Sequence, residues 1–274
     1  MIDNRPENNF AIVTGASQGL GKEMAIELAR KKRNVLLVAL PGEGLPELCN
    51  YLKTEFAVEV DYFETDLTEN DAVFEVASWA LSNYKIDVLI NNAGIGGSLS
   101  FESASINYIE NIILLNVRAL SLLTRLILPE LKNHEKAWIL NVASMASFSP
   151  IAYKTVYPAS KAFVYSFSRG LYEELKDTGV FVSVLHPGPI ATNPDVVKRI
   201  KDNGFFGKLG LISPENLAKI AITQLFKRDT LILPGFMNKI NWLLIKIVPI
   251  WIRLPLVSSV VKRNEIFSQK VRVE

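Results

Sequence analysis

The chain of 274 residues contains little cysteine, little histidine and little net charge. Cys49, the one cysteine, has no partner for an internal disulfide, which fits a reducing compartment. The two histidines, His134 and His186, have no partners at the spacing of metal ligands, so the sequence predicts no metal site. Because 30 basic side chains balance 28 acidic ones, for a net charge of +2, we expect no nucleic-acid partner.

The sequence also lacks a targeting segment, a domain linker and an internal repeat. The opening MIDNRPENN is polar, with no apolar stretch behind a basic start, so we expect no cleaved secretion signal and a cytoplasmic location. The length and the absence of a linker favour one domain, residues 1–235. It is followed by an apolar and basic extension, residues 236–274, that packs on the same domain.

Seven short apolar runs alternate with longer helical patterns between Phe10 and Leu233. The runs are 10–13, 34–40, 58–63, 86–90, 137–143, 180–185 and the stretch around Leu231. They are nearly continuous in apolar residues, which is typical of strands buried on both faces of a parallel sheet. The segments between them, such as 19–32 and 70–82, are long enough for crossover helices. The pattern predicts an α/β fold: a doubly wound parallel sheet of about seven strands, a Rossmann fold with three α/β/α layers.

The first run leads into TGASQGLG, residues 14–21, which contains Gly15, Gly19 and Gly21. In a doubly wound sheet this turn lies at the carboxyl edge, where ligands bind. Gly15 would let the chain turn, and the other two glycines would leave room for a ligand and for the helix to lie on the strand. The N-terminus of the helix would offer N–H groups to a pyrophosphate. A dinucleotide explains all three glycines, while a tight turn without a ligand is the alternative, since the spacing is not the commoner GxGxxG.

Further motifs follow in chain order, each at the end of an apolar run or at the start of a helix. They are NNAG at 91–94, Ser144, YPASK at 157–161 and PGPIAT at 187–192. Together with TGASQGLG, Asp66 and Asn116, they make residues 10–192 resemble the classical short-chain dehydrogenase/reductase family. The stretch IVTGASQGLGKEMAIELA and the apolar tail are most similar to its 3-oxoacyl and 17β-hydroxysteroid reductases.

Tyr157 and Lys161 are four residues apart, so on a helix they share one face. A nearby ammonium favours the phenolate and should lower the pKa of Tyr157 towards neutrality. We therefore expect Tyr157 to give a proton to a carbonyl oxygen during reduction and to take one in the reverse reaction. The resemblance implies that Lys161 also holds the nicotinamide ribose. A pair on the surface of an amphipathic helix is the alternative.

Ser144 and Asn116 complete the expected catalytic set. The Ser144 hydroxyl could donate to a substrate carbonyl as negative charge grows on the oxygen, although a serine at the end of a strand is more often a turn or cap residue. Asn116 lies among leucines and isoleucines in a helical pattern, so we expect it to bond backbone or water inside the protein. The resemblance implies a proton-relay role for Asn116, and a purely structural asparagine is the alternative.

The resemblance also implies a nicotinamide dinucleotide cofactor, which would supply hydride transfer. The expected cofactor-binding residues are Gly15, Ser17, Gln18, Gly19, Leu20, Gly21, Asp66, Leu67, Asn92, Ala93, Gly94, Tyr157, Lys161, Pro187, Gly188, Ile190 and Thr192. Asn92, Ala93 and Gly94 would line the adenosine ribose, and Thr192 would meet the diphosphate. Asp66 would bond the adenine amine, with a helix cap as its alternative.

The end of the second run decides between NADP and NAD in this family, by an arginine or lysine in the first case and an acid in the second. Ala39 and Leu40 provide neither. We favour NADP(H), because no carboxylate at Ala39 would repel a 2′-phosphate, although Glu43 lies close and NAD stays open. The basic triplet at 31–33 is expected to be solvated charge at a helix end.

The extension contains Lys246, Pro249, Arg253 and Pro255 within its apolar sequence, which excludes a spanning helix there. Three interpretations stay open: a lid over an apolar substrate, a subunit contact, or a helix at a membrane surface. The function that we expect is reduction of a ketone or aldehyde on an apolar small molecule by hydride transfer from NAD(P)H. The resemblance implies a homo-oligomer. A cofactor-binding redox sensor or scaffold without turnover is the alternative from another class, and a peripheral membrane protein is a third.

Overall fold

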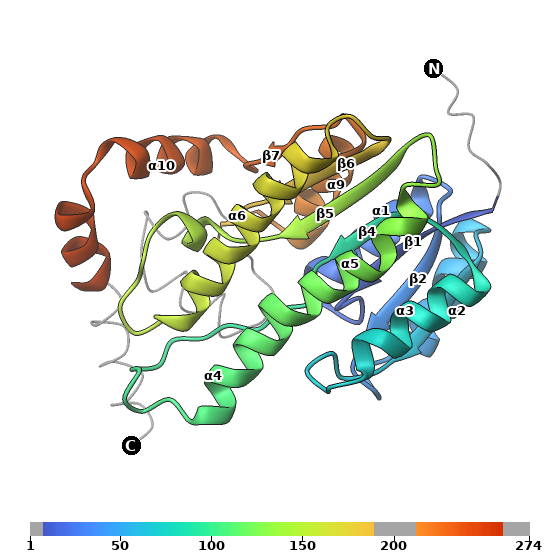
Figure 1. Ribbon diagram of the computed structural model, residues 1–274, viewed down its shortest axis with the longest axis horizontal. Helices are drawn as coiled ribbons and strands as arrows, with labels where there is room; N and C mark the ends of the chain where they lie inside the picture. Colours follow the sequence, from blue (N-terminus) through green and yellow to red (C-terminus); the bar gives the residue numbers. More distant parts are fainter. Residues whose placement is uncertain (1–7, 189–211, 260–274) are drawn as a thin grey trace.

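A seven-stranded parallel sheet forms the centre of the protein, in the order β3-β2-β1-β4-β5-β6-β7. The computed structural model describes residues 8–188 and 212–259 (Figure 1). The strands are β1 (Asn9–Thr14), β2 (Asn34–Ala39), β3 (Val60–Glu64), β4 (Lys85–Asn91), β5 (Ala137–Val142), β6 (Val180–Leu185) and β7 (Leu231–Ile232). The prediction of about seven parallel strands is confirmed, and the strand order reverses between β1 and β4.

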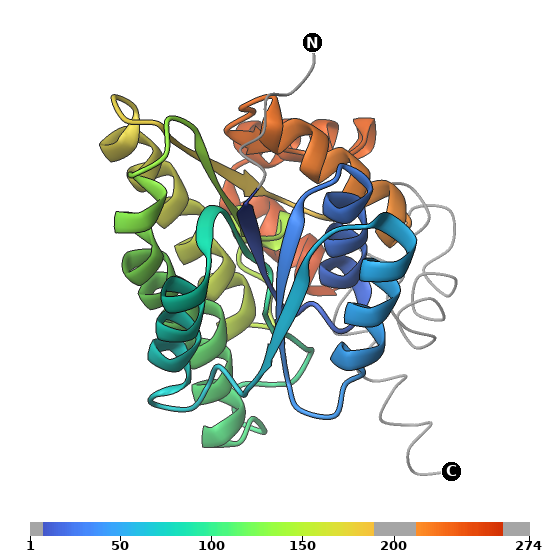
Figure 2. The same ribbon diagram turned by 90° about the vertical axis from the view of Figure 1, so that its right-hand side faces the viewer.

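Helices cover both faces of this sheet (Figure 2). They are α1 (Gly19–Arg30), α2 (Leu45–Phe56), α3 (Ala72–Asn83), α4 (Ile106–Ile113), α5 (Leu120–Leu131), α6 (Val156–Leu175), α9 (Pro214–Phe226) and α10 (Phe236–Ile247). A π-helical segment, η1 (Leu114–Ala119), joins α4 to α5, and a short 3-10 helix, η2 (Met145–Phe148), follows β5. One apolar core lies under α1, α2 and α9, and a second lies under α3, α5 and α6. The three-layer α/β/α prediction is therefore confirmed.

Helix α1 shows how the sequence sets an element and its end. Leu20, Met24 and Leu28 recur every four residues and are buried against the sheet. The helix ends at Arg30, because Lys32 adopts a left-handed conformation with φ of 60° and its N–H bonds the carbonyl of Ala29. The helix is thus two residues shorter than the sequence predicts.

The expectation of a fully solvated basic triplet after α1 is wrong for Arg33. Its side chain is 7% exposed and pairs with the buried carboxylate of Asp87 on β4. The guanidinium also lies 5.9 Å from the ring centre of Trp138 and 5.6 Å from that of Phe226. Burial of this charge is tolerated because its ion partner is buried with it.

Helices α4, η1 and α5 form one helical stretch, Ile106–Leu131, which is long and apolar enough to cross a membrane by length and composition. It is the one such stretch among the residues that the structure describes. Leu123, Ile127 and Leu131 are almost completely buried in the core beside the sheet. The apolar composition therefore fits a core helix of a folded domain.

The C-terminal extension begins with α10, directly after Gly235, and continues into a second apolar helix, Ile250–Ser259. Its contacts with the domain include one from each of its two helices. Asn238 is buried beside Gly188, and the guanidinium of Arg253 donates a 3.0 Å hydrogen bond to the carbonyl of Phe148 in η2. The extension is therefore tied to two loops at the carboxyl edge of the sheet.

The turn after β1 gives a first testable prediction. A methyl group on Gly21 would overlap the carbonyl oxygen of Gly15 and lie 2.5 Å from Asn92 Nδ2, so Gly21→Ala should destabilise the fold by about 2 kcal/mol. Gly170 is exposed on α6 with no neighbour within 4 Å, so Gly170→Ala should stabilise by about 0.5–1 kcal/mol. Urea unfolding of both variants measures these changes. Equal stability of Gly21→Ala and wild type would contradict the packing argument.

Candidate active site

The ends of β1 and β4 are joined by hydrogen bonds at the point where the strand order reverses. Thr14 Oγ1 accepts from the backbone N–H groups of Asn92 and Ala93, both at 3.0 Å, and donates to the carbonyl of Ile90. Asn92 Nδ2 in turn donates to the carbonyls of Thr14 and Gly15, at 2.9 and 3.2 Å. The glycine-rich turn and the NNAG segment are thereby fixed against each other.

The glycine-rich turn leaves space and backbone donors at this edge. Gly15 and Gly19 have φ of 64° and 55°, a region that favours glycine. Helix α1 begins directly after the turn, with no side chain capping its first N–H groups and no acid in its first turn. These N–H groups and the positive end of the helix suit a pyrophosphate, so the turn fits a dinucleotide.

Asn116 is almost completely buried in the π-helical segment η1. Its Oδ1 accepts from the N–H of Ile95 at 3.0 Å, and its Nδ2 donates to the carbonyl of Ile95 and to Ser160 Oγ, both at 2.9 Å. Asn116 therefore joins η1, α6 and the loop after β4. The expectation that it bonds backbone is confirmed, whereas its role in proton relay stays a prediction.

Lys161 places an ammonium in the interior, with 5% of the residue exposed. Its Nζ donates to the carbonyl of Val142, at the end of β5, at 2.9 Å. A methyl group on Gly94 would lie 3.1 Å from this Nζ and 3.0 Å from Asn116 Oδ1, so glycine keeps this space open. Burial lowers the pKa of Lys161 to about 8, because a buried ammonium loses its hydration.

Tyr157 lies in the first turn of α6, with its ring against Gly96. A methyl group on Gly96 would lie 2.5 Å from the tyrosine ring, so this glycine makes room for the ring. Burial raises the pKa of Tyr157, and a hydrogen bond from the Ser144 side chain partly opposes this. The expectation that Lys161 lowers the pKa of Tyr157 is wrong for this structure, because burial outweighs the other influences on the phenol and Lys161 bonds Val142.

Ser144 is the N-cap of η2 and lies beside Tyr157. Its Oγ accepts from the N–H of Ala146 at 3.1 Å, so the cap role weighed for this serine is present as well. Its carbonyl accepts from Ser147 Oγ at 2.7 Å and lies 3.0 Å from His186 Nδ1. Burial lowers the pKa of His186 to about 4, so this histidine is neutral near pH 7. His186 therefore supports the backbone that carries Ser144.

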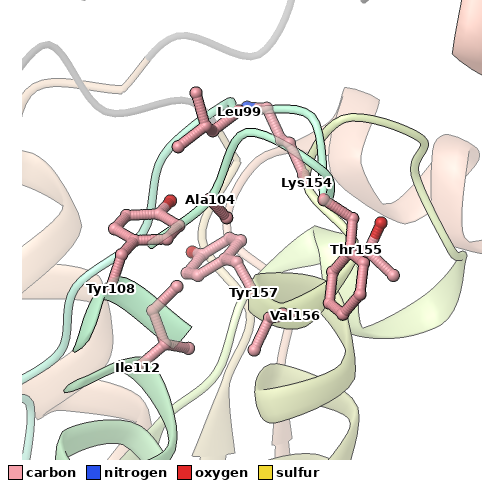
Figure 3. Close-up of a pocket in the computed structure, with 9 residues that line it drawn as sticks. Leu99, Ala104, Tyr108, Ile112, Lys154, Thr155, Val156 and Tyr157 are labelled. Carbon is pink, nitrogen blue, oxygen red and sulfur yellow. The ribbon is translucent and has the colours of Figure 1, made fainter. Parts of the chain in front are cut away.

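A small pocket adjoins Tyr157, as Figure 3 shows, with Tyr108 entering from α4 and Tyr157 from α6. Its lining is mostly apolar and consists of Leu99, Phe101, Ala104, Tyr108, Ile112, Lys154, Thr155, Val156 and Tyr157. The pocket holds only about 10 Å³, which is room for a single water-sized group beside the phenol. The arrangement thus combines an acid or base with apolar walls.

The other predicted cofactor residues fall into three groups. Leu67, Pro187 and Gly188 are ordered near the ends of β3 and β6, and Leu67 is buried. Asp66 bonds both the N–H and the hydroxyl of Thr68, at 2.9 and 2.8 Å. Helix α3 begins at Ala72, so the helix-cap interpretation of Asp66 is wrong. Ile190 and Thr192 lie outside the described residues.

The loop after β2 places a carboxylate beside the glycine-rich turn. Glu43 Oε2 accepts from Ser17 Oγ and Gln18 Nε2, both at 3.1 Å. Ala39 is buried and Leu40 is 46% exposed, so neither supplies charge at the strand end. Glu43 is therefore the acid that lies beside the glycine-rich turn. The sequence indicates that Glu43 is near the end of β2, but it does not indicate the hydrogen bonds to Ser17 and Gln18.

The sequence analysis missed four residues that shape the site: Gly96, Tyr108, Asn238 and Arg253. The run Gly94-Ile95-Gly96-Gly97 is a sequence signal for close packing that extends beyond the NNAG motif. Gly97 has the same function as Gly96, since a methyl group there would lie 2.6 Å from the Tyr108 hydroxyl. Asn238 and Arg253 contact loops about 50 and 100 residues away, which no local pattern indicates.

The fold and the site together define a dinucleotide-binding oxidoreductase class with a tyrosine, a lysine and a serine at the switch point of the sheet. A family model described as short chain dehydrogenase matches residues 9–203. The chain therefore belongs to the short-chain dehydrogenase/reductase family, whose members are oxidoreductases acting on small molecules.

Named relatives agree with this assignment. The chain is similar to very-long-chain 3-oxoacyl-CoA reductase of Rattus norvegicus, with 36% identity over 187 residues, 67% of this chain and 60% of the relative. It is also similar to hydroxysteroid dehydrogenase-like protein 1 of Gallus gallus, with 30% identity over 249 residues, 89% of this chain and 73% of the relative. Its match thus spans about 60% of the length of several curated relatives.

Among solved structures, the chain is similar to a short-chain dehydrogenase from Sphingobium yanoikuyae in complex with NADPH. The TM-score is 0.76 and the identity is 28%, covering 85% of this chain and 91% of the other. It also resembles a bulky-bulky ketone specific alcohol dehydrogenase from Comamonas testosteroni, with a TM-score of 0.74 and 26% identity over 89% of this chain and 96% of the other. Both comparisons agree with the family assignment.

The buried His186 generates a prediction about acid stability. The unfolded chain binds a proton on this histidine near pH 6.5 and the folded chain only near pH 4, so stability falls as the pH drops between these values. From pH 7 to pH 5 the loss from His186 should be roughly 2 kcal/mol.

Urea unfolding at both pH values measures this loss. His186→Gln should remove that share of the pH dependence, while His134→Gln, which leaves His186 in place, should keep it. If His186→Gln unfolds with the wild-type pH dependence, burial of this histidine does not govern acid stability.

Proposed function

We propose that this chain is an NADP(H)-dependent reductase that converts a ketone or aldehyde on an apolar substrate into an alcohol. The observation that carries the proposal is the position of Tyr157: it is hydrogen-bonded to Ser144, borders an apolar pocket, and lies one helical turn from the buried Lys161. This arrangement provides a proton donor and a hydrogen-bond donor where a carbonyl oxygen would lie.

The cofactor would lie across the switch point of the sheet. The residues suited to hold it are the N–H groups at the start of α1, the segment from Asn92 to Gly94, and Lys161. When bound, a nicotinamide dinucleotide supplies the hydride for the carbonyl carbon. NADP(H) is favoured because a solved relative is in complex with NADPH and because neither Ala39 nor Leu40 carries an acid.

The protonation states of the site residues suit the direction of reduction. Since burial raises the pKa of Tyr157, the phenol keeps its proton near pH 7 and can give it to the carbonyl oxygen. Since the pKa of Lys161 is about 8, this ammonium can release a proton at little cost and so restore the phenol. The Ser144 hydroxyl would stabilise the substrate carbonyl oxygen by a hydrogen bond as negative charge develops on it.

A 3-oxoacyl thioester is the substrate class that we favour. Several relatives are named as 3-oxoacyl-CoA reductases, and the acyl chain would occupy the apolar walls beside Tyr157 once they move apart, because the pocket as it stands holds only about 10 Å³. A steroid-like ketone would need the same movement, and the Gallus gallus relative favours it as the second candidate.

Exposed apolar residues on α4 and α6 bear on how the chain assembles. Ile106, Ile113 and Phe163 are 73%, 46% and 39% exposed on α4 and α6, and such residues favour a contact with a second copy. A homo-oligomer through these helices agrees with the family resemblance. A location in the cytoplasm, with contact to membranes, is part of the same proposal.

The proton donor can be tested by one substitution. Tyr157→Phe should lower kcat for carbonyl-dependent NADPH oxidation by about 100-fold or more, because the ring keeps its packing and only the acid is lost. Binding of NADPH, measured by fluorescence titration, should change little. A wild-type protein that binds NADPH and reduces none of a panel of 3-oxoacyl, steroid and small aromatic carbonyls would favour the non-catalytic sensor instead.

Cofactor choice can be tested at Glu43. If its carboxylate lies beside the 2′-phosphate, Glu43→Gln should tighten NADPH binding several-fold and leave NADH binding nearly unchanged, since only NADPH carries the extra negative charge. Calorimetric titration with both cofactors measures this. Glu47, on α2 beyond the loop, provides the matched control Glu47→Gln. Equal changes for NADPH and NADH would place Glu43 away from the 2′ position.

A further inference from the structure

The two helices of the C-terminal extension present an unusual number of exposed apolar side chains. Leu243, Leu244 and Ile247 on α10 are 51%, 50% and 67% exposed. Trp251 and Leu256 on the helix Ile250–Ser259 are 73% and 64% exposed. We call these five residues the C-terminal apolar face. Exposure of this many large apolar groups within 14 residues marks an interaction surface.

Basic side chains accompany this face and acids are absent from its sequence. Lys239, Lys246 and Arg253 lie within the described extension, and no Asp or Glu occurs between Asp229 and Glu265. Lys246 Nζ lies 3.9 Å from the ring centre of Trp242, so an aromatic ring and a charge lie together. Apolar groups, tryptophan and lysine in one short amphipathic segment match the boundary between lipid tails and anionic headgroups.

The extension lies at the active-site edge of the molecule. Figure 1 shows it, in orange and red, beyond the carboxyl ends of the central strands. Asn238 packs on Gly188, and Arg253 bonds the carbonyl of Phe148 in the helix capped by Ser144. A surface that bound this extension would therefore lie near the opening of the site.

We propose that the C-terminal apolar face binds the surface of a bilayer that carries anionic headgroups. Trp251 and the leucines enter the region below the headgroups, while Lys239 and Lys246 contact lipid phosphates. The helices lie along the surface and do not span it. Docking would also present the site to an apolar substrate dissolved in the membrane; this last step, unlike the docking itself, rests on the proposed function.

A bilayer explains the charge pattern better than a second copy of the chain. The exposed patch on α4 and α6 provides a separate surface for self-association, without this concentration of bases. A lid would bury its apolar side chains over the pocket, whereas each residue of the C-terminal apolar face keeps half or more of its surface exposed.

Flotation of the full chain with vesicles tests the proposal. Wild type should float with phosphatidylcholine vesicles that contain about one-third phosphatidylserine, and about tenfold less well with pure phosphatidylcholine. Replacing Ile247 and Trp251 by serine should abolish flotation. Phe74 and Leu81, which are 48% and 40% exposed on α3, give the matched control Phe74→Ser/Leu81→Ser, which should float like wild type.

Two further variants keep the test independent of folding. Lys239→Gln/Lys246→Gln leaves the apolar groups in place and should weaken binding to anionic vesicles about tenfold or more, with a smaller dependence on salt. Trp251→Phe should still float, but without the part of the blue shift in tryptophan emission that Trp251 contributes.

The outcomes separate docking from the alternatives. All variants should keep the wild-type unfolding temperature, and Trp251→Phe should keep the wild-type rate of carbonyl reduction in solution. Absence of carbonyl reduction by wild type would count against the proposed function and not against docking. Absence of flotation by wild type overturns the proposal. Flotation of the Ile247→Ser/Trp251→Ser variant at the wild-type level also overturns it. If wild type does not bind vesicles and this variant no longer self-associates, the C-terminal apolar face binds a second copy of the chain instead.

Discussion

The hydrogen bonds between Thr14 and the segment Asn92–Ala93 are the constraint on which the site depends. They join the ends of β1 and β4, the two strands between which the order of the sheet reverses. In a doubly wound sheet this is the point where helices leave in opposite directions and a crevice opens. The Thr14 hydroxyl takes part in three hydrogen bonds, and the Asn92 side chain donates two more to the backbone carbonyls of Thr14 and Gly15. The crevice therefore has walls that are fixed before any ligand binds.

The buried ammonium of Lys161 explains much of what surrounds it. A charge in the interior is costly unless polar groups replace its water, and here the carbonyl of Val142 does so in part. Asn116 fixes the loop beside it through both hydrogen bonds to Ile95, and Gly94 keeps the space between them free. The free-energy cost of burying the charge that remains lowers the pKa of Lys161 to about 8. Near pH 7 Lys161 therefore stays mostly protonated, but a pKa this close to neutrality lowers the cost of releasing its proton.

The sequence was sufficient for the sheet, its layers and the residues at the strand ends, because these follow from local apolar runs and from motifs that end them. It could not show Arg33 buried against Asp87, since that pairing joins residues 54 apart. It also misjudged Tyr157: spacing on a helix indicates that Lys161 is near, but the balance between charge and burial depends on Gly96, Ser144 and the walls around the ring. The positions of Ile190 and Thr192 lie outside the described residues and stay predictions.

Ser144 lies where the candidate site meets the C-terminal extension. The short helix that it caps is held from inside by His186, which stacks on Phe148 with ring centres 4.3 Å apart and lies against the Ser144 carbonyl. From outside it is held by Arg253, through the carbonyl of the same Phe148. Phe148 therefore connects the extension to the short helix capped by Ser144, and neither Tyr157 nor Lys161 takes part in this connection. Under the function proposed above, Ser144 would bond the substrate carbonyl, and this contact through Phe148 would connect the extension to that hydrogen bond.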